Sequence, residues 1–144
     1  MYLTYDDYTA MGGTLTDEAA FNSLLYRAES KVDWYTFERL RNISYCELDI
    51  RVKRCVYEII KLLQNADAAN SLPTMDGSSI TGTSAVGIRN QSNDGVSISY
   101  EVNDASNIMD RLDKDINERI NTMLSGVRDK KNHRVLYRGM YPDE

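Results

Sequence analysis

The sequence predicts a mainly α protein: a small bundle of about four helices with one β-hairpin inserted between the third and fourth helices. Three long segments repeat apolar residues with the 3.6-residue period of a helix that buries one face. Between the last two of these segments, apolar and polar residues alternate instead, which is the period of a half-buried strand. The chain has 144 residues and two prolines, a length that indicates one domain.

The first helix is expected to be short. Thr4 can cap it, because Asp7 follows three residues later as a carboxylate version of the capping box. Gly12 and Gly13 then end it, since glycine adopts the left-handed backbone that terminates helices. Thr16 can cap a second helix over about residues 17–37. Its apolar face consists of Phe21, Leu24, Leu25, Ala28, Val32 and Tyr35.

The third helix has the strongest pattern and is expected over about residues 46–65. Its stripe is Leu48, Val52, Cys55, Ile59 and Leu62, widened by Val56, Ile60 and Leu63. A stripe this wide indicates burial against more than one neighbour. We therefore expect this helix to be the central one.

Residues 66–104 carry no helical period. Two alternating stretches, residues 84–89 and 96–102, flank a polar segment that ends in Asp94-Gly95, a tight-turn dipeptide. They predict a β-hairpin over about residues 84–102. Because a lone hairpin is barely stable in water, we expect it to pack on the helices or to pair with another chain.

The fourth helix begins after a cap at Asn103, Asp104 or Ser106 and ends at Ser125-Gly126. Its seam is Met109, Leu112, Ile116, Ile120 and Met123. The predicted division is therefore a helical domain over residues 1–126 and a C-terminal tail over residues 127–144. The tail is basic in its middle and carries a short apolar run at Val135, Leu136 and Tyr137, which is typical of a segment that docks on something.

Composition argues against several classes of protein. The chain is 42% hydrophobic and 27% charged, which is too apolar for a disordered chain. A net charge of −5 argues against a protein that binds nucleic acid over its whole surface. No run of 18 apolar residues occurs, so we expect no membrane span. The first residues lack a basic stretch followed by an apolar one, so we expect no signal peptide.

Residues that could perform chemistry are few, and we expect no enzyme, no cofactor and no metal. His133, the single histidine, lies in a charged tail and is expected to be solvated. Cys46 and Cys55 would lie roughly 13 Å apart on one helix, too far for a disulfide. Cys55 belongs to the apolar stripe, and the aspartates at 110, 113 and 115 read as an ordinary solvated helix face.

Tyrosine is unusually frequent, with ten copies against two phenylalanines. A phenol combines apolar area with a polar tip, so tyrosine suits wet contact surfaces. Two interpretations remain open: the tyrosines lie half-exposed at core edges, or they form contacts between identical subunits. The residues that we take as interface candidates are Tyr26, Tyr35, Tyr45 and Tyr57.

Several phrases of the sequence resemble one protein family. They are YLTYDDYTAMGG at residues 2–13, DEAAF at 17–21, DWYTFERL at 33–40, LSGV at 124–127 and VLYRG at 135–139. Together they resemble the head-tail connector (head-completion, or portal adaptor) proteins of long-tailed bacteriophages, in particular those of phages and prophages of Gram-positive hosts. The resemblance spans nearly the whole chain and is weakest at about residues 66–95.

The resemblance implies a structural role in the virion. It implies a ring of about a dozen copies beneath the portal protein, made in the cytoplasm of the bacterial host and placed at the neck of the virion. Such a ring extends the DNA channel and is the platform for the tail completion or stopper protein. Double-stranded DNA would pass without specific binding, with which the net charge of −5 is compatible. The expected portal-docking residues are Val135, Leu136, Tyr137 and Arg138.

Two other functions are weighed against this one. The first is a tail completion or stopper protein of the same phage module, which the three long helical periods make less suitable. The second is a small helical DNA-binding regulator whose phosphate-contacting residues would be Arg51, Lys53, Arg54 and Lys61. Against the regulator, Glu47, Asp49 and Glu58 interleave with these bases and would repel the DNA backbone.

Overall fold

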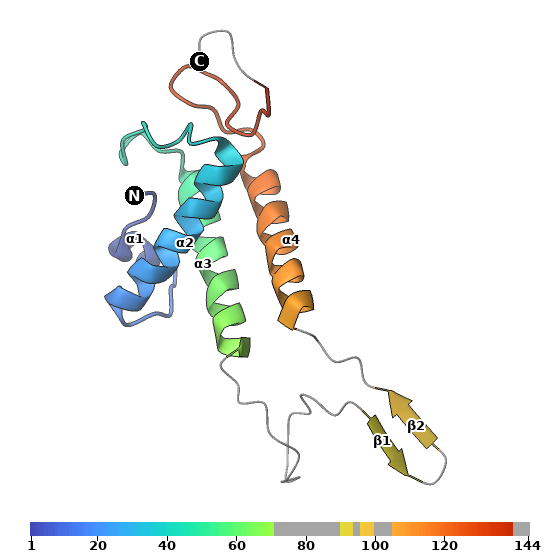
Figure 1. The fold of residues 1–144 in the computed structure, drawn as a ribbon. Helices are drawn as coiled ribbons and strands as arrows, with labels where there is room; N and C mark the ends of the chain where they lie inside the picture. Colours follow the sequence, from blue (N-terminus) through green and yellow to red (C-terminus); the bar gives the residue numbers. More distant parts are fainter. Residues whose placement is uncertain (71–89, 94–95, 100–104, 140–144) are drawn as a thin grey trace.

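The computed structural model describes residues 1–70, 90–93, 96–99 and 105–139. Within these residues the protein is mainly α, with four helices (Figure 1). The elements in chain order are α1 (Tyr5–Ala10), α2 (Glu18–Thr36), α3 (Ile50–Asn70), β1 (Asn90–Asn93), β2 (Val96–Ser99) and α4 (Ala105–Leu124). None of the helices in this part of the chain combines the length and apolar character that crossing a bilayer requires.

Local capping explains where α1 begins and ends. The Thr4 hydroxyl accepts a hydrogen bond from the Asp7 backbone N–H at 3.2 Å, as the sequence predicts. Gly12 has φ +88°, a left-handed conformation that side chains disfavour. Gly13 is needed for a different reason: a Cβ there would overlap the buried ring of Tyr8. The two glycines therefore let the chain turn tightly over α1.

Helix α2 matches its predicted range to within one residue at each end. Its cap is Asp17, whose carboxylate accepts from the Ala19 N–H at 3.0 Å, and not Thr16. The helix ends at Phe37, which adopts the left-handed conformation with φ 54° while its N–H bonds to the Asp33 carbonyl. A bulky residue at this position is unusual, because glycine commonly fills it.

Helix α3 lies four or five residues further along the chain than predicted. The predicted start near Cys46 is wrong because Asp49 ends the preceding turn and accepts from the Arg51 N–H at 2.9 Å. Leu48 is buried nonetheless, from a position before the helix. The helix packs against both α2 and α4, so its predicted central position is confirmed. Its fully buried residues are Val52, Cys55, Val56, Ile59 and Ile60.

Helix α4 ends at Ser125-Gly126 as predicted and contributes Ile116, Ile120 and Leu124 to the core. Strands β1 and β2 pair antiparallel, with Asn90 opposite Ser99. Strand β2 falls within the predicted second strand, whereas β1 occupies part of the segment predicted as the turn. Residues 84–89, predicted as the first strand, lie outside the described residues, so the hairpin over 84–102 stays a prediction.

Residues 127–139 fold back onto the end of the bundle (Figure 1). Val127 and Val135 are buried in the same core as the helices, and the Val135 N–H donates to the Val127 carbonyl at 3.2 Å. The Arg39 guanidinium donates to the carbonyls of Tyr137 and, at 3.0 Å, Gly139. The described part of the predicted tail is thus packed on the chain's own helices.

Candidate functional site

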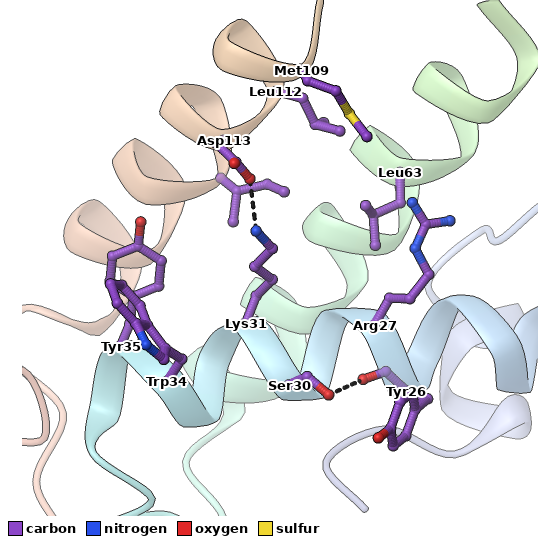
Figure 2. Close-up of a pocket in the computed structure, with 11 residues that line it drawn as sticks. Tyr26, Arg27, Ser30, Lys31, Trp34, Tyr35, Leu63, Met109, Leu112 and Asp113 are labelled. Atoms are coloured by element: carbon purple, nitrogen blue, oxygen red, sulfur yellow. Dashed lines mark hydrogen bonds and ion pairs between the residues drawn. The ribbon is translucent and has the colours of Figure 1, made fainter. Parts of the chain in front are cut away.

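A groove runs between α2 and α4, with α3 beneath it (Figure 2). Its volume is about 700 Å³. One wall is formed by six residues of α2, the floor by Leu63 of α3, and the other wall by four residues of α4. The complete lining is Tyr26, Arg27, Ser30, Lys31, Trp34, Tyr35, Leu63, Met109, Leu112, Asp113 and Ile116.

Several large apolar side chains along this groove are exposed to solvent. Tyr26 is 74% exposed, Trp34 72% and Met109 53%. The Trp34 and Tyr35 rings pack edge to face with their centroids 4.8 Å apart, so part of the aromatic surface is held in place within the subunit. Clustered exposed apolar surface of this kind marks an interaction site more often than a lone exposed residue does.

The charges of the groove have opposite signs on its two walls. Lys31 of α2 reaches across to Asp113 of α4, with 2.7 Å between Nζ and Oδ1 (Figure 2). Arg27 lies 2.6 Å from Asp67 of α3. All four side chains are substantially exposed. Exposed pairs of this kind contribute only about 0–1 kcal/mol to stability. They therefore do not hold the two walls of the groove together firmly.

Two of the four tyrosines predicted for an interface lie in this groove: Tyr26 on its rim and Tyr35 on its wall. A different environment surrounds Tyr45, which is half-buried beside α1. Its hydroxyl donates to the Asp7 carboxylate, and Lys53 Nζ lies 3.6 Å from its ring centroid. The hydrogen bond from Tyr45, helped by Lys53, lowers the pKa of Asp7. This tyrosine therefore joins α1 to α3.

Tyr57 also makes contacts within the subunit. Its ring is half-buried, with its centroid 5.7 Å from that of Tyr8, and Lys61 lies 5.4 Å from the ring. The first interpretation of the tyrosines therefore applies to Tyr45 and Tyr57, and contacts between identical subunits stay a prediction. Tyr45 and Tyr57 lie at the edges of the core, whereas Tyr26 and Tyr35 contribute to an open surface.

The four residues predicted for portal docking differ in their exposure to solvent. Val135 is fully buried and Leu136 is half-buried against the core. Tyr137 is 49% exposed and Arg138 is exposed. Of these four residues, only Tyr137 and Arg138 offer extensive surface to a partner in the isolated subunit.

The residues capable of chemistry are dispersed. Burial raises the pKa of the Cys55 thiol to about 12, and Glu58 adds to the effect, while Cys46 is exposed. His133 is not solvated as expected: it is half-buried, with Nδ1 3.4 Å from Asp129 Oδ2. Within the described residues, no group of three or more His, Cys, Asp or Glu side chains could hold a metal ion.

The bases proposed for a DNA-contacting face are largely paired with acids. Arg51 lies 2.7 Å from Asp49, and Lys61 lies 3.9 Å from Glu58. Lys53 pairs with Asp7 at 3.4 Å, although Arg54 is exposed. Of the interleaved acids, Asp49 and Glu58 pair with bases of this face, and Asp7 pairs with a third base, which makes the face a poor phosphate-binding surface.

Sequence reasoning missed the groove residues Trp34 and Arg27 and placed Met109 in a buried seam. A signal for Trp34 was present. It lies next to Tyr35 in the sequence and therefore outside the apolar stripe of α2, on a helix face whose other residues are mostly polar. No comparable signal exists for the groove itself, because its walls come from segments about eighty residues apart in the chain.

No protein-family model matches the chain, and neither a curated protein nor a solved structure matches it.

Proposed function

We propose that this protein is a head-tail connector of a long-tailed bacteriophage with a Gram-positive host. About a dozen copies form a ring beneath the portal protein, extend the channel through which double-stranded DNA passes, and bind the tail completion or stopper protein. The protein is made in the host cytoplasm and ends at the neck of the virion. Its role is structural, with no catalysis and no cofactor.

The phrases that resemble the connector family support the proposal because they occupy structural positions. In the opening phrase, Thr4 caps α1, Tyr8 is buried, and Gly13 lies against the Tyr8 ring. In the closing phrases, Val127 and Val135 lie in the core. Residues that determine a fold make a better family signature than exposed ones, since a change at them costs stability.

The observation that carries the proposal is the exposed aromatic surface of α2. Tyr26 and Trp34 are both more than two-thirds exposed on a chain of 16.4 kDa. A subunit that assembles with copies of itself has a use for such a surface, because aromatic residues are enriched where subunits meet. In the proposed ring, Tyr26 and Tyr35 lie at contacts between identical subunits.

The portal would be contacted at the C-terminal segment. Tyr137 and Arg138 would supply the contact, while the buried Val135 and the half-buried Leu136 anchor the segment to the bundle. The hairpin predicted over residues 84–102 would pack on, or pair with, a neighbour around the ring.

Electron microscopy of the protein mixed with the portal protein of the same phage tests the proposal. We expect added density beneath the portal, in a ring coaxial with it. The double variant Tyr137→Ala with Arg138→Ala should lose this density. Deleting residues 127–144 is a poorer test, because it also removes Val127 and Val135 from the core.

A matched control is the pair Ile50→Ala with Arg54→Ala, which removes an exposed apolar and an exposed basic side chain from α3. It should bind the portal as the wild type does. Absence of binding by the folded wild type would overturn the connector proposal. A salt-dependent shift of duplex DNA at sub-micromolar protein would favour the DNA-binding regulator instead.

A further inference from the structure

We propose that the groove between α2 and α4 binds α2 of a second copy of this chain, so that two copies form a two-fold dimer. In a two-fold contact the same patch is used by both subunits and must complement itself. Here the patch contains both parts that such a contact needs: a groove and, as one wall of it, a ridge with exposed aromatic side chains. The inference does not depend on the connector function.

The apolar part of the patch supplies both exposed side chains that could insert and a groove that could receive them. Tyr26 and Trp34 lie eight residues apart on α2, which places them about 12 Å apart along the helix axis. Both border the groove, and both are largely exposed. The groove offers Leu63 at its floor and Met109 and Leu112 on the facing wall (Figure 2). Reciprocal insertion would remove both aromatic side chains from water at once.

The charged part of the patch is self-complementary in sign. The charged groove residues of α2 are Arg27 and Lys31, whereas α4 supplies Asp113, with the exposed Asp110 one turn earlier on the same helix. Two of the acids of α2 are engaged elsewhere: Glu29 accepts a hydrogen bond from the N-terminal segment, and Asp33 lies 3.2 Å from Arg41. When α2 of one copy lies along α4 of the other, bases therefore face acids on both sides of the two-fold axis.

The ion pairs already present do not prevent this arrangement. Lys31 and Asp113 are 43% and 63% exposed in the single subunit, and an exposed pair contributes little. Exchanging it for the same pair between subunits therefore costs little. This charge pattern favours a second copy over nucleic acid, because the acidic wall would repel phosphates.

The dimer would bury Tyr26 and Tyr35, which the proposed ring also uses. A dimer of free subunits would therefore have to open before the ring could grow.

Sedimentation equilibrium of the whole protein, with and without charge reversal, tests the dimer. One variant carries Arg27→Glu and Lys31→Glu, so that both walls are acidic. The other carries Asp110→Lys and Asp113→Lys, so that both walls are basic. Each variant alone should be monomeric at concentrations where the wild type is a dimer. Their equimolar mixture should form a dimer, because each acidic α2 then meets a basic α4 and each basic α2 meets an acidic α4.

The mixture distinguishes a lost interface from a folding defect. Both variants lack the Lys31–Asp113 pair within the subunit, in the mixture as well as alone, so a dimer that forms only in the mixture reports the contact between subunits. Trp34 is the single tryptophan, so its emission should move to shorter wavelength as the wild-type concentration rises. Trp34→Ala should weaken association about tenfold or more, as loss of a central aromatic contact does. The exposed Ile50→Ala serves as its control and should leave association unchanged.

Three results would overturn the inference. The first is a wild-type protein that stays monomeric up to about 1 mM. The dissociation constant of the dimer would then exceed about 1 mM, which is too weak for a specific contact. The second is a mixture of the two charge variants that stays monomeric. The third is a ring of many copies without portal, which would refute the two-fold dimer while supporting the connector function.

Discussion

Replacing Val135 with alanine tests whether the C-terminal segment belongs to the core. Val135 is fully buried, and the substitution removes two methyl groups. Loss of their transfer free energy costs about 1.6 kcal/mol at ~0.8 kcal/mol per carbon. The cavity left behind adds about 1 kcal/mol. The expected destabilisation is therefore about 2.5 kcal/mol.

The assay is unfolding in urea and by heat, followed by far-UV circular dichroism. For a chain of this length, 2.5 kcal/mol corresponds to a fall in Tm of about 8 °C. The slope of the urea transition should not change, because the same surface is exposed on unfolding. The control is Ile50→Ala, which truncates a side chain that is 51% exposed and should cost less than about 1 kcal/mol. If Val135→Ala were as mild as this control, the segment would not be part of the cooperative core.

Three further predictions concern α1 and the thiols. Gly13→Ala forces a methyl group against the Tyr8 ring and should lower the free energy of unfolding by about 1–3 kcal/mol; an unchanged urea midpoint would show that the ring moves aside freely. The pKa of Asp7 is lowered by the tyrosine and lysine that contact it, so its contribution is present above the unfolded pKa of about 3.9 and is lost as pH falls through the folded value. Asp7→Asn should therefore destabilise more at neutral pH than at about pH 3, and equal destabilisation at both would contradict this. Because alkylation requires the thiolate, the native protein should react at the exposed Cys46 alone, with Cys55 reacting only in urea; two reactive thiols in the native state would be the contrary result.

The helices could be predicted where local interactions determine them. The hydroxyl of Thr4 accepts from a backbone N–H three residues away, so its effect is readable from the sequence alone. The cap of α2 was predicted one residue too early, at Thr16 instead of Asp17, because both side chains can cap a helix. The predicted start of α3 was wrong because burial does not require a helix. Leu48 continues the apolar stripe of α3 yet is buried from the turn before it.

The candidate site was predicted only in part. The frequency of tyrosine indicated a contact surface and led to Tyr26 and Tyr35, but it gave equal weight to Tyr45 and Tyr57. Their positions in the fold separate these two pairs. The Tyr45 hydroxyl bonds to Asp7 of α1, whereas nothing in the described subunit covers Tyr26, which is 74% exposed. The apolar run at the C-terminus was predicted to dock on a partner, which stays a prediction, and its first residue, Val135, lies in the subunit's own core.

The sequence by itself determined that this protein is a small, mainly helical domain. The helical spacing of apolar residues and the capping residues at helix ends depend only on residues that are close together in the chain. Only the tertiary structure decided which helix faces are covered. Helix α3 buries one face of α2 and one face of α4, and the remaining space between these two neighbours stays open. Lys31 and Asp113, 82 residues apart, meet across that space, and no local pattern can encode a surface that exists only once the helices have packed.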